Sequence, residues 1–137
     1  MAWIPMIQED EAESELKEWY DKLREPWGGV DNIMKIHSLN FNTLKGHYEL
    51  YLSAMKGTKD LSYLQREMIA VVVSNVNRCH YWIIHHGAGL RKIKNDDEFI
   101  KQFFKDFKTS PISDQDKKML DYVVKLSLEP WDIEEVD

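Results

Sequence analysis

The stretch LQREMIAVVVSNVNRCHYWIIHH, residues 64–86, carries the signals that decide the fold. Ser62 and Gln65 have the spacing of a capping box, which predicts the start of a helix that continues to about Asn77. The β-branched run 69–73 would also suit a strand, but the length of the segment and the capping box favour helix. Because this helix is apolar on all sides, we expect it to be central and buried. A second helix is predicted from about His80 to Ile93.

Helical periodicity also dominates the rest of the chain, and no Asn-Gly or Asp-Gly hairpin signal occurs. Pro26–Gly29, Gly57 and Pro130 are expected to stop helices. Further helices are predicted over about 9–23, 32–38, 42–55, 96–107 and, after a cap at Ser113, 114–128. We therefore expect an all-α helical bundle in which residues 1–137 form a single domain.

Composition excludes several classes of protein. The chain has 137 residues, of which 43% are hydrophobic, enough to fill a core without disulfides or structural metal. A formal net charge of −6 argues against binding to nucleic acid or anionic membranes. The single cysteine excludes an internal disulfide, and the longest apolar run is far too short to span a bilayer. No targeting segment is recognised, so the expected location is cytoplasmic.

The reactive side chains concentrate between Glu67 and Leu90. At about 100° per residue, Cys79, Trp82 and His86 share one sector of the second helix. If the two helices pack as an antiparallel pair, Glu67 would converge with this sector in a buried pocket. An imidazole oriented by a carboxylate can take the thiol proton, and the resulting thiolate can attack a peroxide.

Other interpretations of the same residues remain open. A lone cysteine in a helix is more often a small buried hydrophobe than a nucleophile, and a His-His pair is usually half core and half surface. Glu67 beside Arg66 is usually solvated or in a local ion pair. A zinc site is disfavoured because Cys79 and the neighbouring histidines splay around one helix, so neither a metal nor a cofactor is predicted.

Residues 64–86 resemble the core of the alkylhydroperoxidase AhpD-like and carboxymuconolactone decarboxylase family, in particular its uncharacterised peroxidase-related branch. In the redox members a Glu is followed, after eleven residues, by Cys-x-x-Cys-x-x-x-His, and Glu67, Cys79 and His86 stand at matching positions. The resemblance extends over nearly the whole chain. It includes Ile4-Pro5, Gly28-Gly29-Val30 and the segment 120–126.

Two departures from the family pattern bear on activity. Trp82 replaces the second cysteine, which in redox members is the thiol assigned the attack on peroxide, and Cys79 matches the partner thiol. Since Trp82 cannot form a disulfide, a dithiol cycle cannot run within this chain. Tyr81 matches a position that is sometimes a relay histidine. Family members also usually continue with further C-terminal helices, which are absent from this sequence.

The resemblance implies an antioxidant protein that reduces small-molecule peroxides at the expense of an external thiol, impaired by Trp82. Cys79, His86 and Glu67 would be catalytic, with Trp82 and Tyr81 in the pocket. The family commonly builds trimers and hexamers, so a homo-oligomer is expected. Two alternatives are a non-catalytic member that acts by assembly or ligand binding, and a carboxymuconolactone decarboxylase-like enzyme that uses Glu67 and His86 as acid and base.

Overall fold

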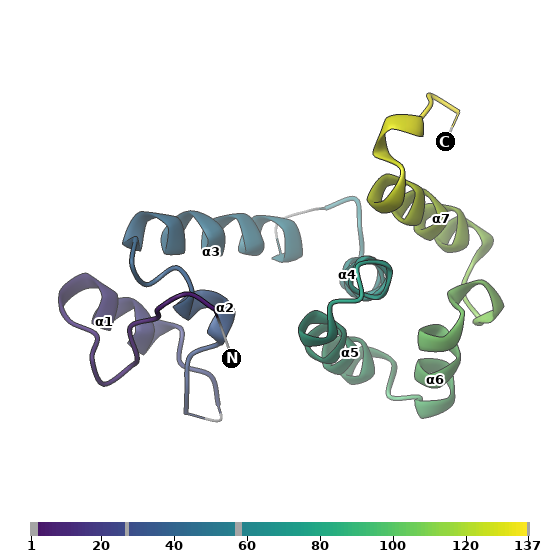
Figure 1. The fold of residues 1–137 in the computed structure, drawn as a ribbon. Coiled ribbons are helices and arrows are strands. Elements are labelled where there is room, and N and C mark those ends of the chain that lie inside the picture. The colour runs from purple at the N-terminus through teal and green to yellow at the C-terminus, as the bar shows by residue number, and fades with distance from the viewer. Residues whose placement is uncertain (1–2, 27, 57–58, 137) are drawn as a thin grey trace. The chain divides into compact units, whose positions relative to one another are not determined.

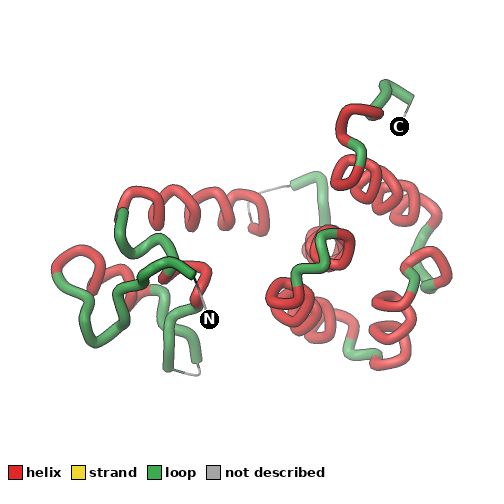
Figure 2. The backbone as a smooth tube through the Cα atoms, in the orientation of Figure 1, coloured by secondary structure: helices red, strands yellow, loops and turns green. Residues whose placement is uncertain are grey.

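The computed structural model describes residues 3–26, 28–56 and 59–136, and within them every regular element is a helix (Figures 1 and 2). The predicted all-α fold is confirmed. The chain divides into two compact units, Met1–Gly57 and Thr58–Asp137. The expectation that one domain spans the chain stays a prediction. None of the described helices is both long and apolar enough to cross a bilayer.

The first unit contains helices α1 (Ser14–Lys22), α2 (Asn32–Lys35) and α3 (Phe41–Lys56). Its core holds residues of all three helices and of the segments that precede α1 and α2. The buried members are Ala12, Leu16, Tyr20, Val30, Met34 and Leu44. All members of this cluster belong to the first unit, so the unit has a core of its own.

The first helix starts five residues later than predicted, at Ser14 instead of about Glu9. The reason is a set of contacts distant in sequence. The Glu9 carboxylate accepts a hydrogen bond from the backbone N–H of Val30 at 2.9 Å and pairs with Lys35 at 3.2 Å. These contacts hold residues before α1 in an irregular path, which the local helical pattern does not reveal.

The second unit contains α4 (Tyr63–Val76), α5 (His80–Lys94), α6 (Asp97–Lys105), the 3₁₀ helix η1 (Phe107–Thr109), α7 (Asp114–Leu128) and η2 (Pro130–Asp132). Helix α4 packs against both α5 and α7, and α5 also packs against α6 (Figure 1). The predicted central position of α4 is thereby confirmed within this unit. Met68, Val71 and Leu120 are fully buried in its core, together with the phenylalanine face of α6.

Most helix ends lie close to their predicted positions because local signals define them. The Ser62 hydroxyl accepts from the backbone N–H of Gln65, and the Gln65 side chain accepts from the N–H of Ser62, so the predicted capping box is confirmed. Ser113 caps α7 without a full capping box: its hydroxyl accepts from the backbone N–H of Asp116 and donates to the Asp116 carboxylate. The predicted helix over 96–107 is shorter in the structure and ends in η1, while Gly57 lies outside the described residues.

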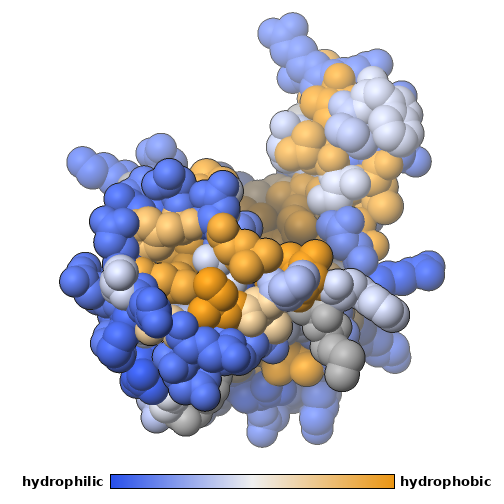
Figure 3. All heavy atoms as spheres, turned by 60° about the vertical axis from the view of Figure 1, so that its left-hand side comes forward, coloured by the Kyte–Doolittle hydropathy of each residue, from blue (hydrophilic) through white to orange (hydrophobic). Residues whose placement is uncertain are grey.

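Several large apolar side chains are exposed among the described residues, including Leu39, Leu50, Ile84 and Trp131. In the space-filling view, apolar side chains gather in patches between charged groups (Figure 3). Scattered exposed apolar residues are ordinary on a protein surface, whereas contiguous patches are typical of interaction sites.

Candidate functional site

The predicted juxtaposition of Glu67 and His86 is present between α4 and α5. Oε2 of Glu67 lies 2.9 Å from Nδ1 of His86, although the residues are 19 apart in sequence. The two residues are only 4% and 7% exposed. A carboxylate can only accept hydrogen bonds, so His86 donates to Glu67 through Nδ1, and Nε2 is the ring nitrogen not bonded to Glu67. The pair is an oriented imidazole, which is what a proton-transfer site requires.

Close approach of α5 to the Glu67 carboxylate depends on Gly89. A Cβ atom at this position would lie 2.8 Å from Cδ of Glu67 and 2.9 and 3.0 Å from its two oxygens. Such distances are below van der Waals contact, so a larger residue would displace the carboxylate. A glycine inside a helix costs roughly 1 kcal/mol relative to alanine, and here the close approach accounts for it.

Trp82 occupies the face of His86. Their ring centroids are 5.1 Å apart and the planes are inclined by 21°, a stacked arrangement. Tyr81 packs edge-on against Trp82 at 5.1 Å, and His85 does the same at 5.3 Å. The position that carries the second thiol in redox members therefore holds an indole in contact with the imidazole. Tyr81 and Trp82, predicted to line the pocket, lie in one aromatic cluster with His86.

Cys79 is the N-cap of α5 and is half-buried. A Schellman motif that ends α4 positions it: the N–H of Cys79 donates to the carbonyl of Ser74 and that of Arg78 to Asn75. Arg78 provides the left-handed residue of this motif, with φ 52°. The thiol thus sits at the point where the chain reverses from α4 into α5.

Cys79 lies at the start of α5, whereas His86 lies further along the same helix. Cys79, the N-cap, precedes His86 by seven positions, a backbone rise of roughly 10 Å, and Trp82 stands between them in the sequence. Among the described residues, no hydrogen bond joins the Cys79 sulfur to Glu67 or His86. The structure brings Glu67 and His86 together, and the expectation that Cys79 shares one pocket with them stays a prediction.

Tyr63 is a site residue that the sequence analysis missed. Burial raises the pKa of its hydroxyl, and the charge of Glu67 together with a hydrogen bond to that carboxylate raises the pKa further. The side chain is 50% exposed, so it connects the buried carboxylate to solvent. The spacing of four residues on α4 was the signal available in the sequence, because residues at i and i+4 share a helix face.

Within residues 3–26, 28–56 and 59–136, no group of three or more His, Cys, Asp or Glu side chains is placed to hold a metal ion. What the site offers is a proton donor and acceptor in His86, a carboxylate that orients it, and an aromatic wall. The nearby thiol of Cys79 is the single nucleophile of this type in the sequence.

Comparison with known proteins places this geometry in context. No family model and no curated protein matches the chain. Among solved structures, it is similar to an uncharacterized peroxidase-related protein from Silicibacter sp. TM1040, with 32% identity and a TM-score of 0.80. The match covers 89% of this chain but 64% of that protein, so the chain spans less than two thirds of its relative.

A second solved structure shows the same fold. It is described as alkylhydroperoxidase AhpD core, an uncharacterized peroxidase-related protein from Ralstonia eutropha JMP134. The TM-score is 0.83, with 20% identity over 97% of this chain and 70% of that one. At this level of identity the likeness supports the helical fold alone.

Proposed function

Because the chain is 32% identical to an uncharacterized peroxidase-related protein, we propose that it belongs to the AhpD-like, peroxidase-related family and reduces peroxides with a thiol, at a low rate. The observation that carries the proposal is the buried hydrogen bond between Glu67 and His86, two side chains that can exchange protons. Buried ionisable pairs are costly to maintain, and they concentrate at functional sites.

Each residue has a defined part in the proposed reaction. The Cys79 thiolate attacks one peroxide oxygen, the O–O bond breaks, and the released alkoxide takes a proton to leave as an alcohol. The sulfur is thereby oxidised to sulfenic acid. An external thiol then condenses with the sulfenic acid, which releases water and forms a mixed disulfide with Cys79. A second external thiol attacks this mixed disulfide, so that Cys79 is released as a thiol and the two external thiols leave as a disulfide. His86, oriented by Glu67, supplies and recovers protons.

Trp82 is the reason for the low rate. Proton transfer needs heavy atoms within about 3 Å or one bridging water, whereas Cys79 is roughly 10 Å of helix rise from His86. Position 82, between them in the sequence, carries an indole that is stacked on His86. The protons must therefore travel through the substrate or solvent, so the pair contributes less than it would beside a thiol at position 82.

Restoring that thiol tests the proposal. We expect Trp82→Cys to raise peroxide consumption with dithiothreitol by about 100-fold, the scale of general acid–base catalysis. Adding His86→Ala should remove the gain if the relay acts in the reaction. A Trp82→Cys protein that folds normally and consumes peroxide no faster than the original chain would contradict the proposed role of the pair.

The activity of the unmodified chain has its own control. Cys79→Ser should abolish the remaining peroxide consumption, because the sequence contains no other thiol. Equal rates for the original chain and Cys79→Ser would end the single-cysteine cycle. Turnover of another small substrate that survives Cys79→Ser but is lost in His86→Ala would instead indicate a decarboxylase-like use of the acid–base pair.

A non-catalytic role is the second candidate, favoured by the stacking of Trp82 on His86. In that case the protein would act by assembly, and the exposed apolar side chains would be covered by further copies. We expect a trimer or hexamer in sedimentation velocity. A monomer at micromolar concentration would contradict assembly as the function.

A further inference from the structure

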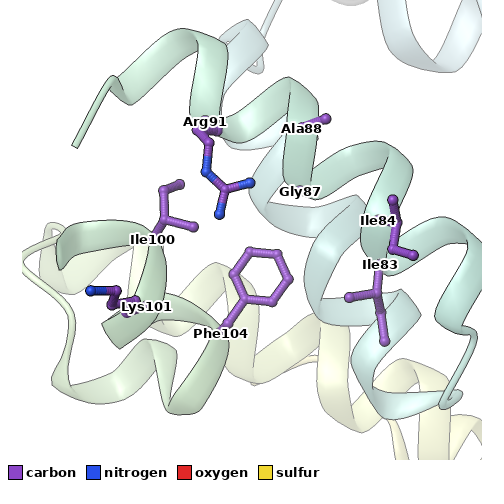
Figure 4. A pocket seen from close by; sticks show the side chains of 8 residues that line it. All are labelled: Ile83, Ile84, Gly87, Ala88, Arg91, Ile100, Lys101 and Phe104. Atoms are coloured by element: carbon purple, nitrogen blue, oxygen red, sulfur yellow. The ribbon is translucent and has the colours of Figure 1, made fainter. Parts of the chain in front are cut away.

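An apolar groove of about 380 Å³ lies between α5 and α6, outside the Glu67–His86 pair. Ile83 and Ile84 line it from α5, and Ile100 and Phe104 line it from α6 (Figure 4). Four large apolar side chains facing one hollow leave little polar surface to hold water. Pockets of this size, apolar with a few polar groups, are typical of small-molecule sites.

Gly87 creates the floor of the groove. A Cβ atom at this position would lie 2.6 Å from Cζ of Phe104 and 3.5 Å from both neighbouring ring carbons. The absence of a side chain therefore allows the ring to reach the backbone of α5. The ring tip and the Gly87 backbone form a surface on which an acyl chain or a flat ring can lie.

The charged groups at the groove are cationic. The Arg91 side chain extends from α5 over the space above Ile100 and Phe104, and Lys101 lies at the outer edge (Figure 4). None of the described residues that line the groove carries a carboxylate. Asp97 lies 3.5 Å from Nε of Arg91, but both side chains are more than half exposed, and such pairs are weak in water.

The groove is distinct from the proposed peroxide site. At about 100° per residue, Gly87 and Arg91 lie roughly 100° and 140° around α5 from His86. The formal net charge of the chain is −6, so the overall field repels anions. If the groove prefers an anion, the attraction must therefore come from Arg91 at the groove and not from the net charge of the chain.

We propose that this groove binds a small amphipathic carboxylate, its apolar part on Ile83, Ile84 and Phe104 and its carboxylate at Arg91. At about 30 Å³ for each non-hydrogen atom, the volume holds about 12 such atoms, the size of decanoate. The Arg91 guanidinium is suited to a carboxylate because it presents two parallel N–H donors to the two carboxylate oxygens.

Decanoate is the probe, added to the ¹⁵N-labelled full chain and followed by amide chemical shifts. We expect saturable shifts at Ile83–Arg91 and at Ile100–Phe104, with a dissociation constant on the order of 0.1–1 mM for a ligand this small. Decyltrimethylammonium, with the same chain and the opposite charge, should bind there at least about tenfold more weakly. Equal or tighter binding of the cation would overturn the assignment of the carboxylate.

Arg91→Gln and Lys92→Gln form a matched pair, since both remove one exposed positive charge from the same turn of α5. Arg91→Gln should weaken decanoate binding by roughly three- to tenfold and Lys92→Gln should leave it unchanged. Ala88→Trp should block the groove. The proposal would be overturned by equal affinities of the two glutamine variants for decanoate, by chemical-shift changes centred elsewhere, or by shifts that do not saturate. It would also be overturned if the groove resonances broaden with protein concentration alone, because a second copy of the chain would then occupy the groove.

Discussion

Replacing Gly89 with alanine tests whether the close approach of α5 to Glu67 holds the pair together. In an open helix this change would stabilise the protein by about 1 kcal/mol. Here the new Cβ would lie 2.8 Å from Cδ of Glu67, and overpacking of this kind costs about 1–3 kcal/mol. Displacing the carboxylate from His86 would cost about 1.5–3 kcal/mol more, the value of a charged hydrogen bond.

The sum predicts that Gly89→Ala destabilises the protein by about 2 kcal/mol or more. With a urea dependence of roughly 1–3 kcal/mol per molar, the midpoint should fall by about 1 M. Far-UV circular dichroism measures the midpoint, and the downfield proton resonance of His86 Nδ1 reports the hydrogen bond directly. That resonance should weaken or move.

Ala88→Gly is the control, because Ala88 is an exposed neighbour in the same helix. It should cost about 1 kcal/mol by propensity alone and leave the His86 resonance in place. A Gly89→Ala protein that is as stable as the original chain, with the His86 Nδ1 proton resonance unchanged, would show that the Glu67 carboxylate does not require glycine at position 89.

Three further changes probe the stability of the fold. Hydrogen bonding to the Val30 backbone, followed by the pairing with Lys35, lowers the pKa of Glu9 from its ordinary 4.5. Its stabilisation is therefore present above pH 4.5 and lost as pH falls through the lower folded-state pKa. In urea titrations, Glu9→Gln should lower the free energy of unfolding by about 1 kcal/mol at pH 7 and should not change it below the folded-state pKa of Glu9. A difference between variant and original chain that stays the same at all pH values would contradict this pH dependence. Ser62→Ala should cost about 1 kcal/mol by removing the capping box, measured by the urea midpoint, and an unchanged midpoint would contradict its role. Arg78→Gly should stabilise the protein by about 1 kcal/mol, seen as a raised melting temperature, because glycine adopts φ 52° without strain; a lowered melting temperature would contradict this.

Local sequence signals were sufficient for most of the helices. Apolar periodicity predicted helices in the regions of α1 and α6, and the capping residues Ser62 and Ser113 predicted where α4 and α7 begin. These signals operate within one or two turns, so they can be recognised without knowledge of the rest of the fold. The Glu67–His86 pairing also followed from the sequence, since short-linked helices pack side by side and place these two faces together.

Contacts between distant residues decided the remainder. Glu9 leaves the predicted first helix because Val30 and Lys35 bind its carboxylate, and Gly89 is required because Glu67 approaches it from another helix. Likewise, helical spacing placed Cys79 and His86 on one face, but only the structure showed Trp82 stacked on the imidazole. A sequence pattern specifies the face on which a side chain lies. Which partner reaches that face, and how closely, depends on the packing of whole helices.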